Sequence, residues 1–295
     1  MASNGKVALQ SIVIEGPQNA RTDPDTGLRF YNWMGTEYPS VTTIRRLAGL
    51  PFGLHNWAVN KVIDRAITNY GALGALVAEG DDKATKKWMR EAATEERDLA
   101  ADKGNRVHFA AATGKQPDEV EDDIKAKVAQ YEDFLAVTRA DIIWNERQVW
   151  HLTAGYAGTA DLLADLTVNG VRARYLLDLK TGKGLYLDHA LQLMAYGGAE
   201  FVGENDTIDD YATTALHSAT RMGIVHLTDV GWALHAVRPT PTLWEALIGL
   251  LAYARFVKDT PDVSALEVEE WGATGLTSPN LERALEATIR EVIKP

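Results

Sequence analysis

Two aspartates and one lysine near the middle of the chain have the types and spacing of a catalytic site. They occur as Gly-x-x-Asp161 and, after an Asn-Gly pair, as Asp178-x-Lys180. An Asn-Gly pair between two alternating runs predicts a β-hairpin with strands at 160–166 and 172–180. Because side chains alternate along a strand, Asp178 and Lys180 share one face, and Asp161 can reach that face from the paired strand.

Two carboxylates at one site predict a bound cation. Carboxylates held close together repel each other unless a cation lies between them, and hard oxygen ligands suit magnesium or manganese. The pattern therefore predicts a site for one or two Mg²⁺ or Mn²⁺ ions at Asp161 and Asp178, with the Lys180 ammonium beside it.

The segment after the hairpin predicts a helix at 185–202. Gln192 and Tyr196 are four residues apart on it, so they lie on one helix face. This face either borders the site or carries a core tyrosine next to a buried amide.

Two further candidates precede the hairpin. His108 lies on a helix predicted at 81–113, which Gly104 is expected to break or kink, and a histidine there is also compatible with ordinary packing. Glu146 lies on a strand predicted at 142–152 and is a candidate acidic ligand. A solvent-facing position, or a pair with the next arginine, is an equally good interpretation of Glu146.

The order of these motifs resembles the PD-(D/E)XK nuclease superfamily, in the RecB-like branch that includes phage exonucleases and CRISPR-associated adaptation nucleases. The resemblance covers residues 38–237, and the segment Tyr38 to Ile44 is similar to the N-terminal part of the phage members. It implies a metal-dependent DNA exonuclease of phage recombination or DNA-end processing. A structure-specific endonuclease or nickase on the same fold, and a catalytically silent relative that binds DNA or a partner, are the alternatives.

The resemblance also assigns roles. Lys180 orients the attacking water or steadies the developing negative charge, and Gln192 and Tyr196 reach the water, the lysine or the DNA backbone. The metal ligands that it implies are His108, Asp161, Asp178 and the backbone carbonyl of Leu179, with Glu146 as a further candidate.

Composition narrows the class of protein. The 295 residues are 46% hydrophobic and 24% charged, as expected of a soluble globular protein. The chain has no cysteine, which excludes disulfides and an iron–sulfur cluster and favours the phage-exonuclease side of the branch, because many CRISPR-associated relatives carry four cluster cysteines. Neither a membrane span nor a signal peptide is evident, so we expect a cytoplasmic protein, in a phage-infected bacterial host, without a membrane partner.

A net charge of −11 argues against a broad DNA-coating surface, so any DNA contact must be local. The start of a helix predicted at 40–47 offers amide donors for a phosphate, although solvated arginines on a capped helix fit the pattern equally well. We expect linear DNA with free ends to contact Ser40, Thr42, Thr43, Arg45, Arg46, Arg106, Thr181 and Lys183.

These elements predict an α/β (α+β) fold with a restriction-endonuclease-like core, in which helices flank a central mixed sheet. A single nuclease domain over 1–295 is expected. It consists of a β-hairpin region at 1–37, a helical part with the histidine at 38–140, the catalytic sheet at 141–237 and closing helices at 238–295. The resemblance adds two candidate partners, a phage single-strand annealing or recombination protein and further copies of the chain. The other predicted elements are strands at 7–14 and 28–33, helices at 54–70, 118–140, 240–257 and 279–293, and a hairpin of 221–227 with 232–237.

Overall fold

A computed structural model of the protein describes residues 19–24, 26–48, 52–114 and 121–259. The strand predicted at 7–14 and the helix predicted at 279–293 lie outside these residues. The chain divides into two compact units, 1–254 and 255–295, and the larger unit contains both sheets and every predicted site residue.

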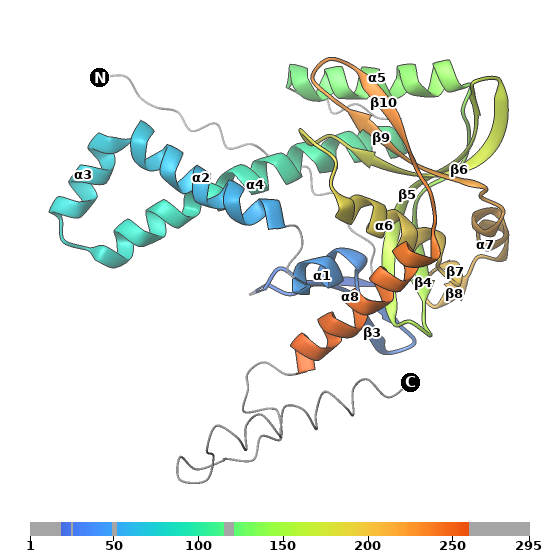
Figure 1. Ribbon diagram of the computed structural model, residues 1–295, viewed down its shortest axis with the longest axis horizontal. Coiled ribbons are helices and arrows are strands. Elements are labelled where there is room, and N and C mark those ends of the chain that lie inside the picture. The colour runs from blue at the N-terminus through green and yellow to red at the C-terminus, as the bar shows by residue number, and fades with distance from the viewer. Residues whose placement is uncertain (1–18, 25, 49–51, 115–120, 260–295) are drawn as a thin grey trace, which may run out of the picture. The chain divides into compact units, whose positions relative to one another are not determined.

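The larger unit is built on a mixed sheet of seven strands in the order β10-β9-β6-β5-β4-β7-β8 (Figure 1). Strands β6 and β9 run parallel and the other neighbours are antiparallel, so the predicted mixed sheet flanked by helices is confirmed. The strands are β4 (Asp141–His151), β5 (Tyr156–Val168), β6 (Val171–Lys180), β7 (Phe201–Glu204), β8 (Thr207–Ile208), β9 (Arg221–Leu227) and β10 (Trp232–Val237).

The central hairpin forms as predicted. Val168 pairs with Val171 across a two-residue turn, in which Asn169 has φ 50° and Gly170 has φ 76°. Positive φ at both positions is the conformation that matches the twist of a β-hairpin and that favours Asn-Gly. The local sequence therefore determines how β5 and β6 align.

Helices cover both faces of the sheet. On one face, α1 (Val41–Leu47), α6 (Leu187–Gly197), α7 (Asp210–His217) and α8 (Pro241–Asp259) share a core with side chains such as Leu163 and Leu176. On the other face, α4 (Asp82–Thr113) and α5 (Asp122–Thr138) pack on Leu162, Leu177 and Leu179. Buried side chains on both faces make the continuous apolar runs of these central strands stable.

Helix α4 brings the histidine to the sheet. It begins at Asp81, whose carboxylate accepts a hydrogen bond from the Ala84 amide, and ends at Gly114 in the left-handed conformation. Of the break or kink predicted at Gly104, the break is wrong, because α4 continues through this residue. The same helix packs against α2 (Phe52–Thr68) and α3 (Tyr70–Ala78).

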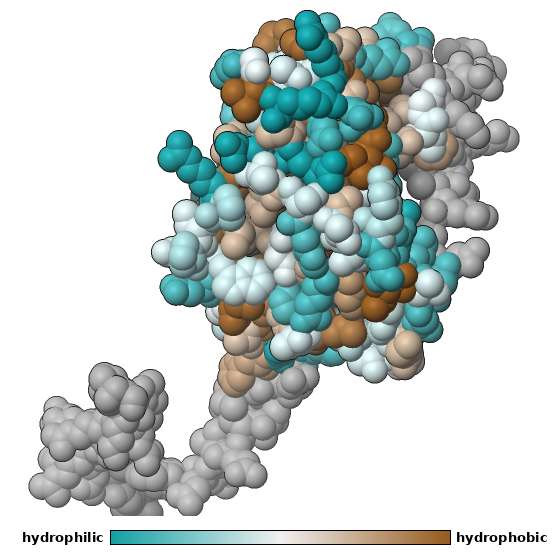
Figure 2. Space-filling model, turned by 90° about the vertical axis from the view of Figure 1, so that its right-hand side faces the viewer, coloured by the Kyte–Doolittle hydropathy of each residue, from teal (hydrophilic) through white to brown (hydrophobic). Residues whose placement is uncertain are grey.

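A small antiparallel sheet of β1 (Ala20–Thr22), β2 (Arg29–Trp33) and β3 (Thr36–Pro39) confirms the strand predicted at 28–33. Tyr31 and Trp33 pack against Trp150 of the central sheet. On the face shown in Figure 2, hydrophobic residues lie in small separate groups among hydrophilic ones. Within the described ranges, none of the helices has the length and apolarity that crossing a membrane requires.

The predicted helix 185–202 is too long. Helix α6 ends at Gly197, and Phe201–Glu204 instead forms β7, which pairs with β4. A short apolar run does not distinguish a buried strand from a helix end, which explains the error. The predicted hairpin of β9 and β10 and the helices near 54–70, 118–140 and 240–257 are confirmed with small shifts at their ends.

Candidate metal centre

The candidate site lies where β5 and β6 stop pairing. Their ladder ends at the pair Leu162 and Leu177. Beyond it, the Asp161 carboxylate accepts a hydrogen bond from the Leu179 amide at 2.7 Å, in the position that a backbone carbonyl would otherwise take. A strand junction of this kind leaves the Leu179 carbonyl available to other partners.

The side-chain alternation of β5 shifts by one residue at Asp161. Ala160 and Leu163 pack in the core with α6, whereas Leu162 packs with α5. Such a shift is typical of a bulge, which bends a strand and redirects a side chain. It directs the Asp161 carboxylate toward β6 and α4.

Glu146 lies directly across from Asp161 on the neighbouring strand, because Asn145 pairs with Leu162 and Arg147 with Ala160. Its φ of 48° is unusual for a residue other than glycine inside a strand. The conformation directs the Glu146 carboxylate to within 3.2 Å of His108 Nδ1.

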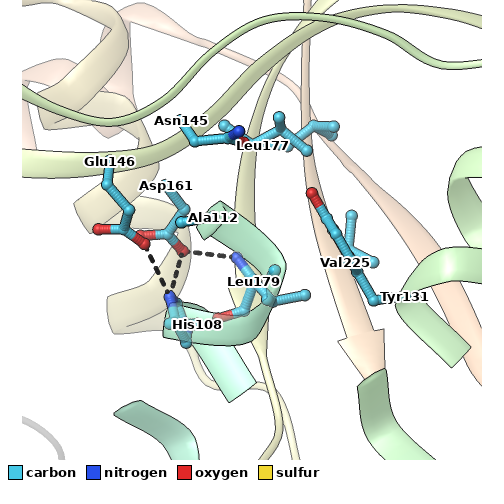
Figure 3. Close-up of a pocket in the computed structure, with 11 residues that line it drawn as sticks. His108, Ala112, Tyr131, Asn145, Glu146, Asp161, Leu177, Leu179 and Val225 are labelled. Atoms are coloured by element: carbon cyan, nitrogen blue, oxygen red, sulfur yellow. Dashed lines mark hydrogen bonds and ion pairs between the residues drawn. The ribbon is translucent and has the colours of Figure 1, made fainter. Parts of the chain in front are cut away.

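His108 reaches these carboxylates from α4 (Figure 3). Its Nδ1 lies 3.2 Å from Glu146 Oε1 and 3.7 Å from Asp161 Oδ2, and its Nε2 lies 3.0 Å from the Leu179 carbonyl oxygen. Burial alone would lower the pKa of His108, but the charges of Asp161 and Glu146 outweigh burial and raise that pKa to about 9. A positive charge is therefore stabilised at this point.

The three side chains fit a divalent metal ion. One ligand atom from each of His108, Glu146 and Asp161 lies within 4.8 Å of the other two. They border a small pocket whose other wall is apolar and includes Tyr131 and Leu177. Two carboxylates and one imidazole suit Mn²⁺ or Mg²⁺, and the apolar wall strengthens electrostatic attraction by excluding water. Glu146, which the sequence offered only as a further candidate, thus lies in the same ligand group as His108 and Asp161.

Asp178 lies beside this group, and its role as a metal ligand stays a prediction. The ligand atoms that lie within 4.8 Å of one another come from His108, Glu146 and Asp161, while the charges of Asp161 and His108 act on the Asp178 carboxyl. Asp178 is completely buried, and its Oδ2 lies 2.6 Å from Lys180 Nζ without hydrogen-bond alignment. Lys180 also approaches the Leu179 carbonyl at 3.5 Å, so this carbonyl connects the two groups.

The buried carboxylates carry more negative charge than their surroundings compensate. Burial raises the pKa of both Asp161 and Asp178, in spite of the nearby positive charges of His108 and Lys180. Neither oxygen of Asp178 accepts a hydrogen bond within the described part of the chain. Both observations fit a site that requires an additional cation.

Gln192 and Tyr196 lie on one face of α6, as predicted, and both side chains are buried. Gln192 Nε2 donates to the Tyr196 hydroxyl at 2.9 Å, and Arg45 Nη1 donates to Gln192 Oε1 at 2.6 Å. Arg45 also forms an ion pair with Asp188, which is buried. The spacing of Asp188, Gln192 and Tyr196 at four-residue intervals was the signal that could have identified Asp188 from the sequence.

Three residues predicted to contact DNA are engaged inside the protein instead. Arg45 has a side chain only 15% exposed because it pairs with Asp188. Ser40 is buried and caps α1, where its hydroxyl accepts from the Thr43 amide. Thr43 is buried as well, and its hydroxyl donates to the Arg29 carbonyl.

The remaining predicted contacts differ in accessibility. Arg106 forms an ion pair with Glu121 at 2.8 Å. Arg46 is exposed and donates to the Gly27 carbonyl, and Thr42 is exposed. Thr181 and Lys183 follow directly after β6, half-buried and exposed respectively.

Comparisons with known proteins add no assignment. No family model and no curated protein matches the chain. Seventeen chains of solved structures match, among them one described as "Crystal structure of SSO0001", with 14% sequence identity over 71% of this chain and 77% of that chain and a TM-score of 0.32. A similarity at this level supports no argument about fold or function.

Proposed function

We propose that this protein is a metal-dependent deoxyribonuclease that hydrolyses phosphodiester bonds, acting as an exonuclease on linear DNA. The proposal depends on one observation. Ligand atoms from four separate elements meet at one point, and they come from His108 of α4, Glu146 of β4, Asp161 of β5 and the Leu179 carbonyl of β6. The pairing of Lys180 with Asp178 beside them fits phosphoryl chemistry.

The charges around the site balance when one divalent ion is bound. With His108 neutral, as a histidine that binds a metal must be, four carboxylates contribute −4 and two cations contribute +2, which leaves −2. These groups are Glu146, Asp161, Asp178, Asp188, Lys180 and Arg45. Buried charges are stable only when they are compensated, so an ion of charge +2 is the simplest occupant.

Each group then has a role. His108, Glu146 and Asp161 would hold the ion, which neutralises phosphate charge and acidifies a water molecule when bound. Asp178 keeps the Lys180 ammonium in place at 2.6 Å, and the ammonium can stabilise the negative charge that develops on the phosphate. Gln192 and Tyr196 support this arrangement from α6.

An exonuclease also fits the charge distribution. With a net charge of −11, affinity for DNA must come from the metal and from a few accessible groups, such as Thr42, Arg46, Thr181 and Lys183. Phage recombination or DNA-end processing in the host cytoplasm, with an annealing protein or further copies of this chain as partners, is the setting that the sequence resemblance suggests.

Linear and closed circular duplexes of the same sequence test the proposal. With Mg²⁺ or Mn²⁺, we expect end-labelled linear DNA to be degraded to short products while closed circles persist. Calcium should bind without supporting turnover, because it accepts longer and looser coordination. Asp161→Asn should be inactive, whereas Asp141→Asn, an exposed aspartate at the start of β4, should retain activity.

Other outcomes would revise the proposal. Cleavage of closed circles at low enzyme concentration would indicate the endonuclease or nickase. DNA binding without cleavage would indicate a silent relative, and full activity in excess chelator would contradict the metal site.

A further inference from the structure

The loop of residues 181–186, which connects β6 to α6 directly after Lys180, is anchored at both ends. The Gly182 carbonyl oxygen lies 2.7 Å from His226 Nε2. The Tyr186 amide donates to His189 Nδ1 at 3.3 Å. Neither contact is part of the metal centre described above.

His226 fixes the first half of this loop next to the lysine. It pairs with Lys180 in the parallel ladder of β6 and β9, so the two residues are neighbours across the sheet. The His226 side chain is buried, and its Nε2 is hydrogen-bonded to the Gly182 carbonyl. On the other side, Gly104 of α4 is so close that a Cβ there would lie 3.5 Å from Thr181 Oγ1.

His189 fixes the second half. Burial, with a smaller contribution from the Lys180 ammonium, lowers the pKa of His189 to about 4, so the imidazole is neutral at pH 7 and can accept the Tyr186 amide. The Tyr186 ring meets the His189 ring edge to face at 5.6 Å and 70°. The orientation of Tyr186 is thereby supported by His189, which lies near enough to Lys180 for the ammonium charge to act on its imidazole.

Two large side chains are exposed where this loop meets α6. Tyr186 is 54% exposed, and Leu187, the first residue of α6, is 72% exposed. Lys183, three residues after Lys180, is exposed and makes no ion pair or hydrogen bond with any residue in the described ranges. Single exposed aromatic residues are common on proteins. The combination found here is more specific than a single exposed aromatic residue. It consists of the fixed Tyr186 ring, the adjoining Leu187 side chain and Lys183, which lies three residues after Lys180.

We propose that Tyr186 and Leu187 form a stacking platform for an unpaired nucleobase next to the scissile phosphate, with Lys183 contacting its backbone. The inference rests on the proposed nuclease function and specifies its substrate as a DNA end with at least one unpaired nucleotide. Aromatic rings stack with every base, so the platform recognises an open end without reading sequence. A paired base inside a duplex has no free face to offer.

A fluorescent adenine analogue, which is quenched on stacking, tests this platform. It is placed as an unpaired terminal nucleotide, at either end of a strand, on a short duplex, and binding is measured in Ca²⁺. We expect wild-type protein to quench the emission. Tyr186→Ala should abolish the quenching and weaken binding about tenfold, whereas Tyr186→Phe should keep both.

Tyr211 provides the matched control. It is 76% exposed on α7 and lies near Arg174, which precedes Lys180 by six residues on β6, about 20 Å along an extended strand. Tyr211→Ala should therefore behave as wild type.

With Mg²⁺, Tyr186→Ala should raise KM about tenfold on the duplex with the unpaired nucleotide and leave kcat unchanged.

The experiment separates the two proposals. If wild-type protein degrades linear DNA but Tyr186→Ala changes neither quenching nor KM, the platform is overturned and the nuclease function stands. If wild-type protein neither binds nor cleaves these duplexes, both are overturned.

Discussion

Tyr196 lies against Gly158 so closely that a Cβ on Gly158 would be 2.4 Å from Tyr196 Cε1. Gly158 is the glycine of the Gly-x-x-Asp motif, three residues before Asp161. The contact explains why this strand position has no side chain, because any larger residue would displace the tyrosine. It also joins the metal-binding strand to α6 through Tyr196 and Gln192.

Gly158→Ala should therefore destabilise the protein and disturb the site together. Overpacking in a closely packed core costs about 1–3 kcal/mol, and we expect this loss in the free energy of unfolding measured in urea. In a Tyr196→Ala background the same substitution should cost much less. Gly71→Ala on α3, where nothing lies within 4 Å of the added methyl, should instead leave stability equal or improve it. Equal losses for Gly158→Ala in both backgrounds would contradict the packing argument.

Lys180→Ala should separate metal binding from chemistry. Lys180 lies outside the ligand group of the metal centre, so Mn²⁺ affinity measured by calorimetry should change little. The rate of DNA hydrolysis should fall about 100-fold, as expected for the loss of one group that stabilises the transition state. Lys125→Ala on the exposed side of α5 is the control and should match wild type. Wild-type rates for Lys180→Ala would remove this lysine from the mechanism.

Arg45→Ala should act on stability, although the sequence predicted a DNA contact. Because Arg45 and Asp188 form a buried pair, removing one partner leaves an uncompensated charge and should cost about 3–5 kcal/mol. Arg46→Ala, one residue further along α1, removes an exposed side chain and should change stability by less than about 0.5 kcal/mol. Thermal unfolding of both variants distinguishes these positions. Equal, small effects would show that the Arg45 pair is not buried in solution.

The pair of Asp165 and Arg174 should give the central hairpin a pH-dependent stability. The hydrogen bond from Arg174, at 2.8 Å, lowers the pKa of Asp165 below its ordinary value. A carboxyl with a depressed folded pKa contributes stability above its unfolded pKa, near 3.9, and loses that contribution as pH falls through the folded value. Arg174→Gln should thus cost about 1 kcal/mol at pH 7 and almost nothing once the pH is below the folded pKa of Asp165. Arg172→Gln, in an exposed pair with Asp141, should show little effect at either pH. A pH-independent loss in Arg174→Gln would point to packing instead.

The sequence was sufficient for the elements whose signals are local. The Asn-Gly turn predicted the hairpin and the four-residue spacing predicted the shared face of Gln192 and Tyr196, and both are present. Local sequence signals failed where tertiary contacts determine the position of a side chain. Alternation could not reveal the shift at Asp161, which brings its carboxylate to 3.7 Å from His108, since a bulge depends on the neighbouring strand. Nor does a pattern of charges show that Arg45 has a buried partner.

The strained backbone of Glu146 lowers the stability of the fold, while its carboxylate contributes to the metal centre. A non-glycine residue at φ 48° within a strand costs about 1–3 kcal/mol, and the surrounding sheet must supply that energy. Glu146→Gly would relieve the strain and delete a carboxylate from the metal centre in the same step. A laboratory selection for heat resistance alone should therefore accept substitutions at Glu146 early, whereas a selection that also demands turnover should retain the glutamate and seek its gains elsewhere.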